Sequence, residues 1–140
     1  MIGKPTEGVR FEVEKGQIRR FARAIGETNA LHFDEGVAKA AGYPSLVAPL
    51  TFPSVLQDFE SLLDKLEVNS HSIMHAEEEY EYFRHIFAGS EVVVTHTVLD
   101  AYEKQAPNGR LVFIVIETRG TDTRSKPFFK GRRVVVEINQ

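Results

Sequence analysis

Apolar residues recur every three or four positions in the first half of the chain and alternate with polar residues in the second half. The segment VEKGQIRRFARAIGE carries apolar residues at helical spacing, namely Ile18, Phe21, Ala22 and Ile25. This spacing predicts a helix that Gly26 can end. A second, short helix is predicted to begin after Asp34, a good N-cap residue, and to end at Gly42.

The clearest helical pattern lies in the middle of the chain. Its apolar residues step by three and four: Phe52, Val55, Leu56, Phe59, Leu62, Leu63 and Leu66. Thr51 can cap the start, and Pro53 falls in the first turn, where its missing N–H costs nothing. The pattern predicts one long helix with a broad apolar stripe, which a large neighbouring element must cover.

Strands are predicted from about Ile73 onward, where the period changes to two. IMHAEEEYEYFRH alternates, and EVVVTHTVLDAYEK, RLVFIVIETRG and KGRRVVVEIN are rich in β-branched residues. The breaks are turn-like and include the pair Asn108–Gly109. We expect four consecutive strands in an antiparallel meander, with a short strand near Val9 to Val13 as a fifth. A long helix followed by a curved sheet predicts an α+β fold in which the sheet wraps the helix, as a single domain over residues 1–140.

Composition and charge exclude several classes of function. The chain has 140 residues, a net charge of −3 and no cysteine. Disulfides, thiolate nucleophiles and cysteine-based metal sites are therefore excluded, and nothing in the charge favours nucleic acid or an anionic membrane as a partner. No apolar run approaches the roughly 20 residues that span a bilayer, and the N-terminus lacks the apolar core of a signal peptide. We expect a cytoplasmic protein.

One short polar stretch, GETNALHFDE, holds the candidate chemistry. It places Glu27, Asn29 and His32 within six residues, flanked by apolar positions. A carboxylate and an imidazole that share one water molecule can act as an acid–base pair. Short matches of this kind are common by chance, so the spacing by itself favours a polar loop after a helix end.

Three stretches resemble the MaoC-like hot-dog family, which comprises (R)-specific enoyl-CoA hydratases and 3-hydroxyacyl-thioester dehydratases. They are IRRFARAIGETNALHFDE, AAGYPSLVAPLTF and HAEEEYEYFRHIFAGSEV. The first resembles the signature Asp-x-Asn-Pro-x-His, and the third resembles the strand and turn that follow the central helix of the family. The second is similar to the branch of fatty-acid-synthase-like dehydratases, which includes small subunits of mycobacterial (3R)-hydroxyacyl-carrier-protein dehydratases. The resemblance covers nearly the whole chain and implies a hot-dog fold, with a sheet of about five strands around a long central helix and short helices before it.

The resemblance assigns roles to the polar stretch. Glu27 stands at the position of the catalytic Asp, His32 at the catalytic His and Asn29 at the Asn of the signature, whereas Ala30 replaces its Pro. Glutamate carries its carboxylate about 1.5 Å further from the backbone than aspartate, so the surrounding loop has to compensate.

Further site residues follow from the same resemblance. The family uses a backbone N–H at the start of the central helix as oxyanion donor. Because Pro49 has none, Leu50 or Thr51 would provide it. Ser54 falls near a serine that supports the site, and His75 either faces the acyl tunnel or is an ordinary strand residue.

The implied function is a hydro-lyase that interconverts a 3-hydroxyacyl thioester and a trans-2-enoyl thioester of CoA or acyl carrier protein, without a metal or redox cofactor. A non-catalytic, substrate-binding subunit of a heterodimeric dehydratase is the first alternative. A hot-dog thioesterase that uses Asp58, Glu60 or Asp64 is the second. Because a meander leaves edge strands unpaired, we expect a homodimer or a heterodimer with a second hot-dog subunit.

Overall fold

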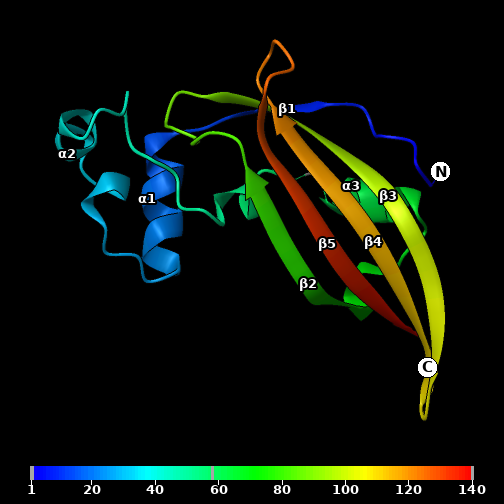
Figure 1. Ribbon diagram of the computed structural model, residues 1–140. Helices are drawn as coiled ribbons and strands as arrows, with labels where there is room; N and C mark the ends of the chain where they lie inside the picture. The colour runs from blue at the N-terminus through cyan, green and yellow to red at the C-terminus, as the bar shows by residue number, and fades with distance from the viewer. Residues whose placement is uncertain (1, 58, 140) are drawn as a thin grey trace.

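A five-stranded antiparallel sheet carries short helices beyond one end and along one face (Figure 1). The computed structural model describes residues 2–57 and 59–139. In chain order the elements, with 3₁₀ turns labelled η, are β1 (Val9–Glu12), α1 (Lys15–Ala24), η1 (Ala30–His32), α2 (Glu35–Ala40), η2 (Phe52–Val55), α3 (Phe59–Lys65), η3 (Ser70–Ser72), β2 (Ile73–Tyr82), β3 (Glu91–Ala106), β4 (Gly109–Thr121) and β5 (Pro127–Asn139). None of the helices within these ranges is both long and apolar enough to cross a membrane.

The strand order in the sheet is β1-β3-β4-β5-β2. The predicted turn at Asn108–Gly109 is confirmed, since β3 and β4 form a hairpin that closes through Pro107 and Asn108. The predicted four-strand meander is wrong at β2, which pairs with β5 and not with β3. Residues 83–90 carry the chain across the sheet. Arg84 fixes this crossing by donating to Asp122 at 2.7 Å and to the carbonyl of Lys126 at 2.9 Å, both in the turn between β4 and β5.

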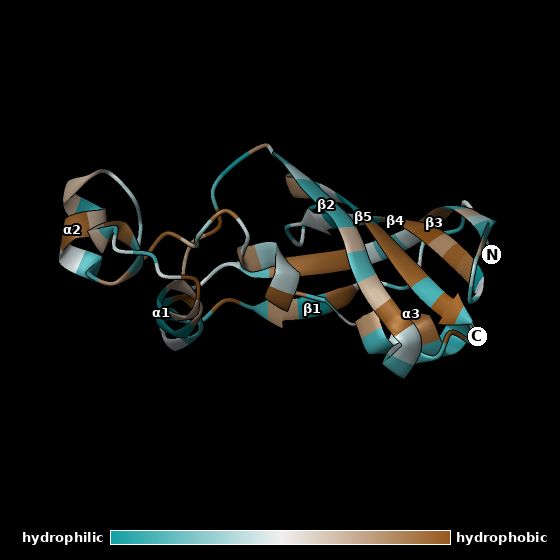
Figure 2. Ribbon diagram, turned by 90° about the horizontal axis from the view of Figure 1, so that it is seen from below, coloured by the Kyte–Doolittle hydropathy of each residue, from teal (hydrophilic) through white to brown (hydrophobic). Residues whose placement is uncertain are grey.

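The two predicted N-terminal helices are confirmed. α1 ends one residue before Ile25, and Gly26 follows with a φ of +77°, a conformation that favours glycine. α2 begins after Asp34, whose carboxylate accepts a hydrogen bond from the N–H of Val37 at 3.1 Å. Both helices lie beyond one end of the sheet, whereas α3 lies nearer its other end (Figure 2).

The predicted long central helix is wrong in the described residues. The chain forms the 3₁₀ turn η2, leaves helical geometry at Leu56 (φ −98°, ψ 56°) and becomes helical again in α3. Thr51 makes no capping hydrogen bond through its side chain, and position 58 lies outside the described residues. The apolar stripe serves two separate clusters, because Leu56 packs in one of them and Leu62 in the other. Packing of the two parts against different regions of the sheet overrides the local helical preference.

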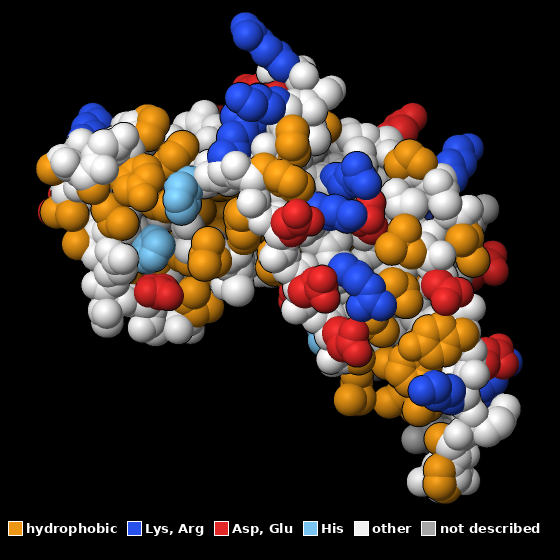
Figure 3. Space-filling view, viewed as in Figure 1, with side chains coloured by type: hydrophobic (Ala, Val, Ile, Leu, Met, Phe, Trp, Pro, Cys, Tyr) orange, Lys and Arg blue, Asp and Glu red, His pale blue; other side chains and the backbone are white. Residues whose placement is uncertain are grey.

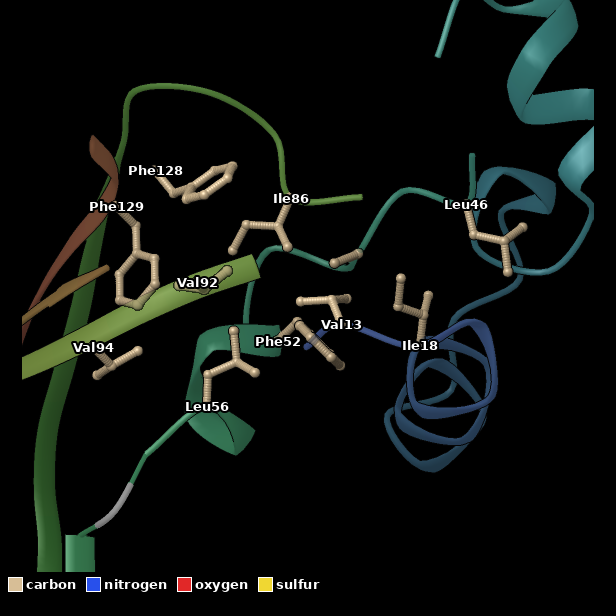
Figure 4. Packing of buried hydrophobic residues seen from close by; sticks show 11 residues of the cluster. Val13, Ile18, Leu46, Phe52, Leu56, Ile86, Val92, Val94, Phe128 and Phe129 are labelled. Carbon is tan, nitrogen blue, oxygen red and sulfur yellow. The ribbon is translucent and has the colours of Figure 1, made fainter. Parts of the chain in front are cut away.

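The larger apolar cluster joins the N-terminal helices to the sheet (Figure 4). Its buried members are Val13, Ile18, Leu46, Ala48, Phe52, Leu56, Ile86, Val92, Val94, Phe128 and Phe129. The smaller cluster comprises Leu62, Val98, Ile114, Ile116 and Val135. The larger cluster therefore packs α1, which directly precedes the polar stretch, against the sheet.

Candidate active site

A pocket of about 350 Å³ opens between the end of α1 and the segment that leads into η2. Glu27, Asn29 and His32 line it together with Pro49, Leu50 and Thr51. Figure 3 shows histidine side chains surrounded by apolar ones on the part of the molecule that contains α1 and α2. The structure thus brings most of the predicted site residues to one place.

His32 is buried, and a backbone carbonyl orients its ring. Its Nδ1 lies 2.6 Å from the carbonyl oxygen of Val47. A carbonyl can only accept, so Nδ1 carries a hydrogen, and in the neutral ring the lone pair is on Nε2. Nε2 lies 3.9 Å from Oε2 of Glu27. The two side chains therefore face one another.

The gap between His32 and Glu27 suits one solvent molecule. Two groups 3.9 Å apart can both reach a water oxygen at the usual hydrogen-bond distance of about 2.8 Å. The Glu27 side chain is 43% exposed and that of His32 is 11% exposed. The carboxylate is thus at the open side of the pocket and the imidazole at the closed side.

Asn29 fixes the turn between these two residues. Its side-chain oxygen accepts a hydrogen bond from the N–H of Leu31 at 3.0 Å and caps η1. The next turn is tied to α1, because Nε of Arg19 donates to the carbonyl of Phe33 at 3.1 Å. The position of His32 is therefore set by bonds on both sides of η1.

The carbonyl that orients His32 belongs to a short backbone ladder. The N–H of Ala48 donates to the carbonyl of Ile86 at 2.9 Å, and the N–H of Ala88 donates to that of Leu46 at 2.9 Å. The N–H of Val47 itself donates to the carbonyl of Leu31 at 3.0 Å. Residues 46–48 and 86–88 consequently hold the acceptor of His32 in place.

Glu35 links α1, α2 and the chain before Val47. Its carboxylate oxygens lie 2.8 Å from Nζ of Lys15 and 3.3 Å from Nζ of Lys39, and one accepts from the hydroxyl of Ser45 at 3.3 Å. The hydrogen bond from Lys15, followed by that from Lys39, lowers the pKa of Glu35 to about 2. The carboxylate of Glu35 therefore stays ionised well below the pH at which a free glutamate is protonated.

The start of η2 offers free backbone donors to the pocket. In residues 2–57 and 59–139, the N–H groups of Leu50 and Thr51 donate to no protein acceptor, whereas the N–H of Phe52 donates to the carbonyl of Pro49 at 2.9 Å. The carbonyl of Leu50 accepts a hydrogen bond from the hydroxyl of Tyr82. Leu50 and Thr51 can therefore present an N–H to a bound oxygen, as expected of an oxyanion site.

Two predicted residues lie elsewhere. Ser54 is within η2 and is not among the residues that line the pocket. His75 is on β2, with its Nε2 3.7 Å from Oε2 of Glu78, and burial lowers its pKa. The supporting role of Ser54 and the tunnel role of His75 stay predictions.

Two of the three carboxylates considered for a thioesterase do not line this pocket. Glu60 and Asp64 lie exposed on α3 and do not line it, and Asp58 lies outside the described residues. Within the ranges that the structure describes, no group of three or more potential ligands could hold a metal ion.

The pocket also contains two aromatic residues that sequence reasoning missed. Tyr43 and His85 both line it, with ring centroids 5.5 Å apart in an edge-on contact. Both residues lie in the stretches that carry the family resemblance, which was the one signal that could have identified them.

Comparison with known proteins gives one family match and several relatives. The model of the FAS1-like, dehydratase domain region matches residues 1–130. A UPF0336 protein of Saccharopolyspora erythraea is 30% identical over 131 residues, which cover 90% of this chain and 81% of the relative. A UPF0336 protein of Clavibacter michiganensis is 39% identical over 92 residues, 63% of this chain. That match spans 62% of the relative's own length.

Solved structures share the fold. In the C-terminally truncated HadBC (3R-hydroxyacyl-ACP dehydratase) complex from Mycobacterium tuberculosis, one chain is 22% identical and superposes with a TM-score of 0.81, with 96% of each chain covered. A MaoC-like dehydratase is 23% identical, with a TM-score of 0.84 over 99% of this chain and 42% of that one. The five-stranded antiparallel sheet with few helices is thus the hot-dog arrangement. Given the match over residues 1–130, the chain belongs to the FAS1-like dehydratase domain family and resembles MaoC-like hydratases and dehydratases in fold.

Proposed function

We propose that the chain is a hydro-lyase that interconverts a 3-hydroxyacyl thioester and a trans-2-enoyl thioester of CoA or acyl carrier protein. The observation that carries this proposal is the pairing of Glu27 with His32 across 3.9 Å, with the His32 ring oriented by the carbonyl of Val47. The pocket beside them is lined partly by apolar residues, including Ile25 and Leu31. It can accept the acyl part of such a substrate.

In the hydration direction the pair holds one water molecule. Glu27 takes a proton from the water molecule while the oxygen of that water bonds to C3 of the enoyl group. In this direction Nε2 of His32 starts protonated. The electron pair of the double bond moves toward the thioester oxygen, and C2 then receives the proton from Nε2. Dehydration is the reverse, so C2 loses a proton to Nε2 and Glu27 protonates the departing hydroxyl. Transfer of the proton from Glu27 to Nε2 of His32, through the next water bound between them, restores both side chains. All atoms of the product then come from the thioester and the water.

The negative charge that develops on the thioester oxygen needs hydrogen-bond donors. Leu50 and Thr51 line the same pocket as Glu27 and His32, and backbone N–H donors act strongly where water is excluded. The backbone before η2 would therefore activate the thioester, and Glu27 and His32 would carry out the proton transfers.

Hydration of crotonyl-CoA by the purified protein tests the proposal. We expect turnover that falls at least about a hundredfold in Glu27→Gln and in His32→Asn, because each variant removes one proton-transfer group. Asparagine retains a donor that can reach Val47, so His32→Asn preserves much of the local structure. Glu60→Gln on α3 and His71→Asn in η3 are the matched controls and should keep wild-type turnover. Equal activity in all four variants would remove this mechanism.

A non-catalytic role beside a partner subunit is the second candidate. The strand β2 lies at the edge of the sheet, and a related structure is that of the HadBC complex. Because an unpaired edge is a ready site for another sheet, we propose that the chain forms a homodimer or a heterodimer with a second hot-dog subunit. An inactive purified chain that gains activity on co-expression with a subunit bearing an intact Asp/His signature would favour this candidate. Sedimentation as a monomer at micromolar concentration would contradict the homodimer.

A further inference from the structure

The hydroxyl of Tyr82 contacts the backbone at the start of η2. Tyr82 is the last residue of β2, and its hydroxyl donates to the carbonyl oxygen of Leu50. The carbonyl of Leu50 and the N–H of Thr51 belong to one planar trans peptide, so they point in opposite directions. A group that holds the carbonyl on one side therefore sets the direction of the N–H on the other.

The two sides of this peptide face different hollows. Leu50 and Thr51 line the pocket that contains Glu27 and His32, and they also line a second hollow, whose wall includes Tyr80 and Tyr82. Tyr82 lines only the second hollow. The peptide thus forms part of the wall between them, with its oxygen on the side of Tyr82.

We propose that Tyr82 is a positioning residue that directs the N–H of Thr51, in preference to that of Leu50, toward the thioester oxygen of the substrate. The inference rests on the proposed function for its catalytic consequence, although the orientation of the peptide does not depend on it. A hydrogen bond to the carbonyl also polarises the peptide, which strengthens the N–H as a donor.

Tyr82 is well placed to hold this peptide firmly. It pairs in register with Phe129 of β5, and the two rings contact each other with centroids 6.4 Å apart. Phe129 is fully buried in the larger apolar cluster. Burial raises the pKa of Tyr82, so the hydroxyl keeps its hydrogen and remains a donor.

The chain supplies a matched control on the same strand. Tyr80 lies two residues earlier, and its ring contacts Phe129 with centroids 6.1 Å apart. Its hydroxyl donates to the carboxylate of Glu78 and not to the carbonyl of Leu50. Tyr80→Phe and Tyr82→Phe therefore remove the same atom from similar surroundings, and only the second removes the contact with Leu50.

The kinetic test compares these two variants in hydration of crotonyl-CoA. We expect Tyr82→Phe to lower kcat about tenfold while KM changes less than about twofold, since a misdirected donor affects the transition state more than binding. Tyr80→Phe should leave both constants at wild-type values. Equal losses in the two variants, or an unchanged kcat in Tyr82→Phe, would overturn the proposal.

Amide hydrogen exchange gives a readout that needs no activity. The N–H groups of Phe52 and Ser54 donate to the carbonyls of Pro49 and Thr51 at 2.9 and 3.0 Å, so they report on the first turn of η2. We expect Tyr82→Phe, and not Tyr80→Phe, to speed their exchange about fivefold, as the loss of one typical hydrogen bond would. If the wild-type protein is inactive, the proposed function fails, and the amide exchange rates alone then test whether Tyr82 positions the peptide. Unchanged exchange, or faster exchange across the whole sheet, would then reject a positioning role for Tyr82.

Discussion

The imidazole of His32 donates from Nδ1 to the carbonyl oxygen of Val47 across 2.6 Å. This bond leaves Nε2 as the only ring nitrogen that can exchange a proton in the pocket, and it directs that nitrogen to Glu27. Val47 is in turn fixed through the paired segments 46–48 and 86–88. The proposed base is therefore oriented by backbone groups and not by a second acidic side chain.

The length of the Glu27 side chain is the first property to test. The aspartate side chain is shorter by about 1.5 Å. The 3.9 Å distance from the carboxylate to Nε2 of His32 is that of the longer glutamate. We expect Glu27→Asp to lower kcat for crotonyl-CoA about tenfold, because the carboxylate retracts from the shared water. Steady-state kinetics measure this. An Asp variant as fast as the wild type would show that the loop adapts to either length.

The cap provided by Asn29 gives a second prediction. Asn29→Ala removes the acceptor of the N–H of Leu31 and should lower the free energy of unfolding by about 1 kcal/mol, the usual value of such a cap. Asn69→Ala removes an equivalent cap on η3, where the side chain accepts from the N–H of His71 at 3.0 Å. We expect similar losses in urea unfolding but a fall in turnover only for Asn29→Ala. A fall in both would argue against a specific link between η1 and the site.

The ion pairs of Glu35 predict a pH dependence of stability. The pKa of Glu35 is lowered from 4.5 to about 2. A depressed pKa in the folded state stabilises the protein above the unfolded value, and this contribution disappears as the pH falls from about 4.5 to about 2. Glu35→Gln should therefore be less stable than the wild type at pH 7, and the difference should shrink toward pH 2. Urea midpoints at several pH values measure it, and a constant difference would contradict the assignment.

Close packing between Gly120 and Phe129 predicts a large loss of stability. A Cβ at position 120 would lie 2.1 Å from Cε1 of Phe129, a buried ring. Gly120→Ala should cost about 3 kcal/mol in the free energy of unfolding, because the ring has to leave its place. Gly16→Ala in α1 is the control, since its new Cβ would meet only the end of Arg20 at 3.4 Å. We expect that change to stabilise the protein by about 0.5 kcal/mol. Equal effects of the two changes in urea unfolding would refute the packing argument.

The sequence was informative where local rules decide the structure. Gly26 and Asp34 mark helix boundaries through their own backbone and side-chain chemistry, and both predictions are confirmed. The β-branched residues of EVVVTHTVLDAYEK likewise predict a strand, which β3 confirms. Such features depend on residues a few positions apart, so they can be read along the chain.

Long-range packing explains the errors. The apolar residues from Phe52 to Leu66 have helical spacing, but the spacing does not show that they pack in two separate clusters. The break at Leu56 was therefore missed. The pairing of β2 with β5 joins segments that are distant in the sequence, and Arg84 just after β2 contacts the equally distant turn at Asp122. In the candidate site, Glu27 and His32 were singled out through the family resemblance of one short stretch, and they lie 3.9 Å apart in the structure. Their catalytic roles stay predictions. The acceptor Val47 and the wall residue His85 come from other segments and were missed.

The two-residue turn at Pro107 and Asn108 has a practical consequence. Because the whole chain contains no cysteine, an Asn108→Cys substitution would introduce a unique thiol at an exposed hairpin tip, on the far end of the sheet from α1 and α2 (Figure 1). A fluorophore or surface tether attached there could report on subunit encounters while leaving the chemistry undisturbed.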